Sequence, residues 1–445
     1  MPGKGMVLSK RHKIFKHGFV LISLSFNVVA MDLVEVYSLA ETNDPIYRQA
    51  VFSYLATRES KPQARALLLP SANISANTFD NDQTISSTFG TPGDANFNSH
   101  GYTLSLAQPL FRWDRYLSLK QTDSLIQQAE AEQLSTQQEL IIRVAVAYFT
   151  VLAAMDNIEF AKAETKSLSR QLKQANQRFE VGLTAITDVH EAQAGFDRAT
   201  ADDILAGNLL DNAKENLREI TGKYITELAS LSDSMPLVSP EPNDIDQWSK
   251  TAESQNMNII AAKLDLENSR QEINIQNAGH LPTLDLVANH GYNVSGGRFG
   301  DTKIRSTAVG LELNIPIYQG GLVSSKSKEA RYLYDQSRQR LEQAFRAAQR
   351  ETRQAYLGVI SGISRVIALK QALVSSETAL KATETGFEVG TRTAVDVVAS
   401  ERTTLSAKRQ HARARYDYLL DSLRLKQAAG TLNSDDLRQI SAWLD

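Results

Sequence analysis

The sequence Gly386–Val397, G-F-E-V-G-T-R-T-A-V-D-V, decides how this chain folds, because most of it occurs twice. The earlier copy is Phe179–Val189, F-E-V-G-L-T-A-I-T-D-V. Each copy lies between two long polar segments with helical periodicity and contains a glycine, Gly182 or Gly390, at the break. Residues that follow helices often need a left-handed backbone, so each copy is predicted to be the turn of a helical hairpin. The chain is therefore predicted to hold two structural repeats with equivalent hairpin tips.

The composition favours long helices, because aromatic residues make up 7% of the chain and Ala, Gln, Glu, Lys, Arg and Leu dominate long tracts. The chain has no cysteine. This excludes thiol chemistry and thiolate metal sites but leaves the redox compartment open.

Residues 1–30 are predicted to be a secretory signal peptide. Lysines and arginines precede a short apolar run, Phe19–Phe26, and small residues suit cleavage after Ala30. The alternative is a retained anchor, but the run is shorter than the ~20 residues of a membrane helix. Without the basic leader the chain is mildly acidic, so nucleic acid is not an expected partner. No later segment is judged long and apolar enough for a membrane helix, so spanning a membrane would require strands.

The first repeat is assigned to residues 31–222. Two runs with alternating polarity, Ser71–Phe79 and Tyr102–Leu110, surround a polar loop and predict a β-hairpin. An apolar heptad seam then predicts a long packed helix. The predicted segments after the first short helices are a hairpin at about 71–110, a long helix at 112–179, a tip at 180–186 and a helix at 184–222.

The second repeat, residues 247–430, follows a proline-containing segment, 223–246, that is predicted to be an irregular linker in the equatorial region between the repeats. It is expected to open with one helix over 247–278. The further predicted segments are a β-hairpin at about 283–317, a long helix at 323–387, a tip at 388–392, a helix at 393–429 and a tail at 431–445.

Four strands of about ten residues suit membrane-spanning β-strands, yet four strands cannot close a barrel. An unpaired strand edge is costly in lipid, so several chains would have to share one barrel. Two chains would supply eight strands, and three would supply twelve and leave room for a lumen. The alternative is a soluble sandwich, or a small sheet that caps a helical bundle.

Several motifs resemble those of the TolC family of outer-membrane efflux and secretion channels. They are Leu311–Gly321, L-E-L-N-I-P-I-Y-Q-G-G, together with His280–Leu286, Arg178–Val189, the V-G-T-R-T-A-V-D-V run and Ala428–Asn433. The resemblance covers the chain from about Met31 to its end. It implies an α+β membrane protein in which a homotrimer forms a twelve-stranded β-barrel, continuous with a long periplasmic α-helical barrel.

The resemblance also implies a location and partners. The channel would lie in the outer membrane of a Gram-negative bacterium, among its lipids, and extend into the periplasm. Its tips would close it at rest, and an inner-membrane transporter with a periplasmic adaptor would open it there. Efflux, type I secretion or both would be its function.

The resemblance assigns roles to residues at the two tips. Asp396 would contribute to an acidic ring at the pore entrance, and such rings favour cations. The second aspartate of the family motif is Ala399 here, which predicts weaker cation selectivity. The resemblance also implies a set of residues that hold each hairpin tip to its neighbour and so keep the gate closed. They are Asp188, Thr187, Arg392, Gln171 and Phe387.

These roles have plainer alternatives. Thr393 and Asp396 have the spacing of a helix capping box, so both roles are expected together for Asp396. Asp188 and Arg392 could form ordinary surface pairs, worth about 0–1 kcal/mol. Phe387 stands where the family has tyrosine, so one hydrogen bond of the gate should be absent.

Catalysis has little support in the sequence. There is no H-E-x-x-H pair and no G-x-S-x-G elbow, and no cofactor, metal site or enzymatic activity is expected. The competing hypothesis for the whole chain is a soluble periplasmic coiled-coil scaffold or adaptor. It explains the heptads and the signal peptide but not the four alternating segments.

Overall fold

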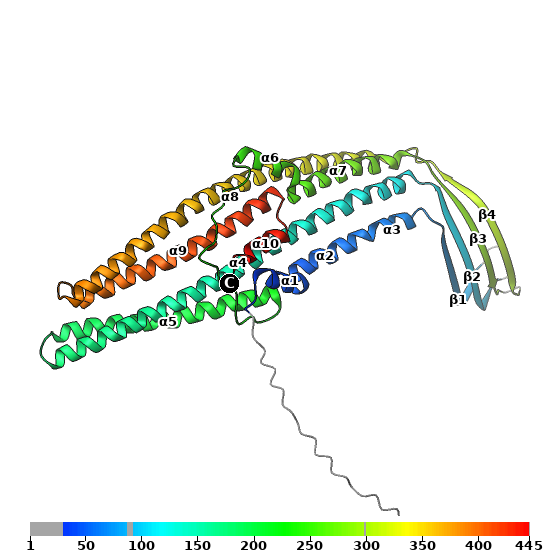
Figure 1. The fold of residues 1–445 in the computed structure, drawn as a ribbon. Helices are drawn as coiled ribbons and strands as arrows, with labels where there is room; N and C mark the ends of the chain where they lie inside the picture. Colours follow the sequence, from blue (N-terminus) through cyan, green and yellow to red (C-terminus); the bar gives the residue numbers. More distant parts are fainter. Residues whose placement is uncertain (1–29, 87–91, 298–299, 445) are drawn as a thin grey trace, which may run out of the picture.

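The structure is a computed structural model that describes residues 30–86, 92–297 and 300–444. Of the predicted signal peptide it describes Ala30 alone, so that prediction falls outside the described residues. The chain is elongated, with a β-sheet at one end, two helical hairpin tips at the other, and several short helices between them (Figure 1).

The first repeat begins with short helices, enters the sheet and returns through a helical hairpin. Its elements are α1 (Leu33–Asn43), α2 (Pro45–Arg58), α3 (Ser60–Ala66), β1 (Ser71–Ile85), β2 (Gly93–Phe111), α4 (Trp113–Glu180) and α5 (Ile186–Thr221). The strands of this hairpin extend further into the intervening polar segment than the alternating runs of the sequence indicated.

The second repeat has the same order. Its elements are α6 (Ile245–Gln255), α7 (Met257–Asn277), η1 (Ala278–His280), β3 (Thr283–Ser295), β4 (Thr302–Asn314), α8 (Leu322–Glu388) and α9 (Ala394–Ala429), followed by α10 (Ser434–Ser441). The two long helices, α4 and α8, have 68 and 67 residues. At about 1.5 Å per residue each is about 100 Å long.

The four strands form one antiparallel sheet in the order β1-β2-β3-β4. Each repeat contributes one hairpin, and the pairing of β2 with β3 joins the repeats. Within the described chain β1 and β4 each pair on one side only. Both outer edges therefore carry backbone groups that this sheet leaves without strand partners.

The two faces of the sheet differ in chemistry. On one face Leu104 lies opposite Ile74 and His290, and Val309 lies opposite Ala288. We call this the apolar face; its side chains include Ile74, Leu104, Leu106, Val309, Leu311 and Leu313, all exposed in the single chain. The opposite face is polar and includes Asn73, Ser75, Thr103, Ser105 and Asn289.

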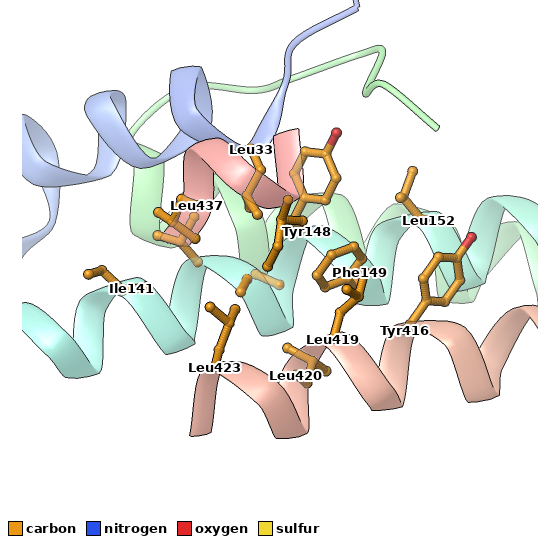
Figure 2. Close-up of a cluster of buried hydrophobic side chains, with 14 of the residues drawn as sticks. Leu33, Ile141, Tyr148, Phe149, Leu152, Tyr416, Leu419, Leu420, Leu423 and Leu437 are labelled. Carbon is orange, nitrogen blue, oxygen red and sulfur yellow. The ribbon is translucent and has the colours of Figure 1, made fainter. Parts of the chain in front are cut away.

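The hydrophobic core lies midway along the molecule, where α1, α4, α9 and α10 meet (Figure 2). Tyr148 and Phe149 of α4 are buried there, and the Phe149 ring stacks on Tyr416 with 5.5 Å between ring centroids. The Tyr148 hydroxyl donates a hydrogen bond to the Ala229 carbonyl at 2.7 Å. This bond fixes the segment between the two repeats to the core, because a buried hydroxyl needs a partner.

Two sequence-based expectations about helices were wrong in detail. The helix expected over 247–278 is broken at Asn256, whose side chain caps α7 by accepting the Asn258 and Ile259 N–H groups at 3.0 and 3.2 Å. The Asn256 side chain also donates to the Ala428 carbonyl at 2.9 Å, which ties the break to the end of α9. The segment expected to be a tail contains α10, whose Leu437 is fully buried in the core.

The expectation that no segment after the leader is long and apolar enough for a membrane helix was also wrong. Both α4 and α8 contain an 18-residue stretch that meets the length and composition of a membrane span. A core helix meets the same criteria, and 44% of the stretch in α4 is buried inside the chain. The corresponding stretch of α8 is 11% buried, so most of its apolar surface is open in a single chain.

Gly430 ends α9 with a φ of +78°, and a Cβ at this position would lie 2.1 Å from the Gln255 carbonyl oxygen. We expect Gly430→Ala to lower the free energy of unfolding by about 2–4 kcal/mol, because it adds backbone strain and a clash. Guanidinium unfolding, followed by the helical circular-dichroism signal, measures the change.

Gly207→Ala is the matched control, since a Cβ there would meet Ile158 at an ordinary 3.9 Å inside a helix. It should be neutral, or stabilising by up to about 1 kcal/mol. Equal stability of the two variants would contradict the tight junction at Gly430.

Candidate functional site: the helical hairpin tips

The two copies of the repeated sequence form the turns of two helical hairpins, α4–α5 and α8–α9. Both turns lie at the end of the molecule opposite the sheet (Figure 1). Gly182 and Gly390 have φ angles of +77° and +80°, and the space where their Cβ atoms would lie is open. Backbone conformation, and not lack of room, is therefore the reason for glycine at both positions.

The second tip has a complete helix cap. The Thr393 hydroxyl oxygen accepts the Asp396 N–H at 3.2 Å, and the Asp396 carboxylate accepts the Thr393 N–H at 2.9 Å. The Thr393 hydroxyl also donates to this carboxylate at 2.9 Å. The predicted capping box is thus present at the N-terminus of α9.

Asp396 is fully exposed and charged in this arrangement. Hydrogen bonds from the backbone and side chain of Thr393 lower the pKa of its carboxyl group below the usual value, with a smaller contribution from the charge of Arg392. An exposed carboxylate with a lowered pKa keeps its negative charge in mildly acidic solution. Ala399 lies one turn further along α9 and carries no charge.

The first tip is capped differently. Ala185 occupies the position of Thr393 and makes no side-chain cap. The neighbouring Thr184 hydroxyl instead donates to Asp188, and the Thr187 hydroxyl lies 3.5 Å from the same carboxylate. The repeated sequence therefore gives the same turn twice, with a complete capping box in the second copy only.

Arg392 lies against the end of α8. Its Cγ would be 2.8 Å from a Cβ at Gly386, so Gly386 leaves room for the arginine side chain. Within the described residues of one chain, Arg392 forms no ion pair. Phe387 of α8 is 38% exposed, and Gln171 is partly exposed on α4.

The structure of one chain does not join the predicted gate residues into a cluster. Asp188 and Thr187 belong to the first tip, whereas Arg392 and Phe387 belong to the second. In the described part of the chain, no hydrogen bond or ion pair connects these two sets. Gln171 likewise has no hydrogen-bond partner among the described side chains of either tip.

Contacts that the sequence did not indicate connect α4 to α9 along the two hairpins. The Arg402 guanidinium donates to Glu164, and the Ser167 hydroxyl donates to Glu401. Nearer the core the Tyr416 hydroxyl donates to Asp156 at 2.8 Å, and burial raises the pKa of this carboxyl group. The partners are more than 230 residues apart in the chain, so no regular spacing in the sequence could have predicted these pairs.

The described residues include no group of three or more His, Asp or Glu side chains placed to hold a metal ion. Charged groups at the tips are paired locally or exposed. A four-stranded sheet with one apolar face, joined to paired helices of about 100 Å, fits the class of outer-membrane channel subunits.

Comparison with known proteins agrees with this class. The family model described as "Outer membrane efflux protein" matches residues 36–223 and 248–431, one range for each repeat. The chain belongs to this family. The prediction of a TolC-family outer-membrane protein with two repeats and a four-stranded sheet is confirmed.

Individual relatives match over nearly the whole chain. The outer membrane protein TolC of Vibrio cholerae is 38% identical over 95% of this chain and 96% of its own length. The alkaline protease secretion protein AprF of Pseudomonas aeruginosa is 29% identical over 96% of this chain and 90% of its own. The crystal structure of the CmeC outer membrane channel of Campylobacter jejuni has the same fold, with a TM-score of 0.78, 16% identity, and coverage of 99% and 98%.

The difference between the two caps gives a pair of opposite variants. Thr393→Ala should weaken the start of α9 by about 0.5–2 kcal/mol, because it removes both hydroxyl contacts. Ala185→Thr introduces the missing hydroxyl at the start of α5 and should stabilise it. Hydrogen exchange of peptides that cover each tip measures both effects, with faster exchange expected in the first variant and slower exchange in the second.

Each variant also leaves the other tip unchanged as an internal control. Equal exchange of the second tip in Thr393→Ala and in the unaltered protein would show that the capping box does not hold the start of α9.

Proposed function

We propose that this protein is the outer-membrane exit duct of a transport system that crosses the whole cell envelope. Three copies form a closed channel: the sheets join into a twelve-stranded barrel in the membrane, and the hairpins join into an α-helical barrel in the periplasm. The duct is passive and has no catalytic activity. A transporter of the inner membrane and a periplasmic adaptor open it at the hairpin tips.

The observation that carries this proposal is the incomplete sheet. Its apolar face suits contact with lipid, but both of its edges lack partners within the described chain. Lipid cannot hydrogen-bond to the free backbone groups, so each edge must pair with another copy. Three copies supply twelve strands, which close around a lumen lined by the polar face.

The long helices support the same assembly. The apolar side chains of α8 that are open in a single chain include Leu357 and Ile367, both 58% exposed, and Val374, 48% exposed. Contact with helices of a neighbouring copy would remove this surface from water. A soluble scaffold with these helices would leave the apolar face of the sheet without a role.

Both kinds of cargo have support among the relatives. The family description names efflux, and the name of AprF includes secretion of a protease. We therefore propose that the duct serves efflux of small molecules and one-step secretion of unfolded proteins, with cargo chosen by the transporter.

The tip residues would form the gate in the assembled channel. We assign Asp396 to the acidic ring at the entrance, because its carboxylate is exposed and charged. Arg392 has no ion pair within its own described chain, so we assign its partners, Asp188 and Thr187, to the tip of a neighbouring copy, with Gln171 and Phe387 beside them. Phe387 cannot donate a hydrogen bond, and Ala399 adds no second ring of charge.

Deletion of the gene tests the function as a whole. We expect higher sensitivity to toxic small molecules and loss of proteins that are normally secreted in one step. A plasmid copy of the gene should restore both, and the mature chain should be found with the outer membrane. Unchanged sensitivity and secretion, with the chain in the soluble periplasmic fraction, would contradict the proposal.

Conductance of the purified channel in a planar bilayer tests the gate. Asp396→Asn should reduce the preference for cations, because it removes the proposed ring of charge. The lowered pKa of the Asp396 carboxyl group predicts that the unaltered channel keeps its cation preference in mildly acidic solution. Arg392→Ser should raise the resting conductance, because it removes one Arg392 contact from each of the three copies. If each contact is worth up to about 1 kcal/mol, their loss shifts the equilibrium between closed and open channels towards the open state by roughly a hundredfold.

Lys381→Ser is the matched control, since Lys381 is an exposed cation of α8 without an ion pair among the described residues. It should leave both selectivity and resting conductance unchanged. If Asp396→Asn and Arg392→Ser also behave like the unaltered channel, the tip residues do not form the gate.

A further inference from the structure

The apolar face of the sheet ends in a group of cations and aromatic rings at the side away from the helices. Tyr102 of β2 lies opposite Tyr292 of β3, and Tyr292 lies opposite Arg305 of β4. The Arg305 guanidinium lies over the Tyr292 ring, 5.7 Å from its centroid, and the Tyr102 and Tyr292 centroids are 6.3 Å apart. One step further out, Lys303 lies opposite Val294. We call Tyr102, Tyr292, Lys303 and Arg305 the rim cluster.

The position of the rim cluster corresponds to the outer border of the membrane. At about 3.4 Å per residue, the run from Leu284 to Val294 is about 34 Å long. A strand tilt of about 40° reduces this to about 26 Å of height. The apolar band of outer-membrane barrels is about 25 Å tall and is bordered by aromatic residues. Because the helices leave the opposite end of the sheet, the rim cluster belongs to the leaflet that faces the outside (Figure 1).

The two cations of the rim cluster are exposed and have no carboxylate partner among the described residues of their own chain. Lys303 and Arg305 both project from β4, and neither forms an ion pair within the described residues. The acidic residues of the same face are Asp80 and Asp82 of β1, three strand spacings or about 14 Å across the sheet, and Asp94 of β2, about 27 Å along the strand from Tyr102. Asp301 is exposed just before β4. The rim cluster is therefore a positive patch that continues directly from the lipid-facing surface.

We propose that the rim cluster binds the phosphate group of a phosphorylated lipid of the outer leaflet. Arg305, held in place by the Tyr292 ring, offers its guanidinium donors to the phosphate oxygens, and Lys303 adds a second charge. The acyl chains of the same lipid pack on the apolar side chains below, such as Leu104 and Val309. This inference rests on the proposed placement of the apolar face in lipid, and it adds a specific lipid contact to it.

The test uses the full-chain assembly, purified in detergent, freed of lipid and titrated with diphosphorylated lipid A in native mass spectrometry. Binding to the double variant Lys303→Gln, Arg305→Gln should be at least tenfold weaker than binding to the unaltered protein. Lipid A from which the phosphates have been removed should bind both proteins equally weakly. The matched control, Arg338→Gln with Lys381→Gln, removes two exposed cations from α8 and should bind lipid A like the unaltered protein.

Two outcomes would overturn the inference. One is equal binding of diphosphorylated lipid A to the unaltered protein and to the rim variant. The other is a combined result: the rim variant dissociates into single chains, and lipid A binds equally well with and without its phosphates. That result would mean that Lys303 and Arg305 form ion pairs with Asp80 or Asp82 of a neighbouring copy instead of binding lipid. Neither outcome would contradict the proposed exit duct, as long as the unaltered protein is found in the outer membrane.

Discussion

The constraint on which the rest of the structure depends is the hydrogen bonding of strand edges. A sheet of four strands with one apolar face cannot lie in lipid while β1 and β4 remain unpaired. Pairing with further copies satisfies the edges and at the same time sets the diameter of the barrel. The helices continue directly from the strands, since α4 follows β2 and α8 follows β4 with few residues between. The strand count therefore sets the symmetry of the helical part as well.

The core at the middle of the molecule fastens the two repeats to each other. It lies partway along α4 and α8, the two helices of about 100 Å. The short helices α1 and α10 close over α4 and α9 at Tyr148, Phe149 and Leu437, and the Tyr148 hydroxyl holds the segment between the repeats. On the tip side of this core the contacts between α4 and α9 are mainly polar pairs such as Glu164 with Arg402. Replacing an exposed polar pair by contacts with water costs little free energy, whereas exposing the apolar core to water costs much more. The hairpins are thus joined to each other more weakly towards the tips than at the core.

The sequence predicts the parts of this fold that depend on local patterns. The two glycine turns, the long heptad helices and the alternating strands all follow from residue order, because each has a period or a required backbone angle. The break at Asn256 was missed because its capping partners sit within a continuous polar helix pattern, and its contact with Ala428 is made across the fold. The helix α10 was missed for a similar reason: its eight residues become stable only when Leu437 reaches the core. At the site, the capping box was readable from its spacing, but the pairs between α4 and α9 were not.

The two tips show how a duplicated sequence can give unequal parts. Duplication makes the two hairpins alike, yet their turns differ in sequence. Here the turn glycines and the aspartates Asp188 and Asp396 are common to both tips, so the shared residues form the turn and the start of each returning helix. Two of the differences are an alanine against Thr393 at the cap and a threonine against Arg392 beside it. The second tip therefore combines the firmer cap with the cation that lacks a partner in its own described chain. In the proposed trimer the contact of Arg392 with a neighbouring tip would be separate from the bonds that cap α9, so losing that contact would leave the hairpin itself folded.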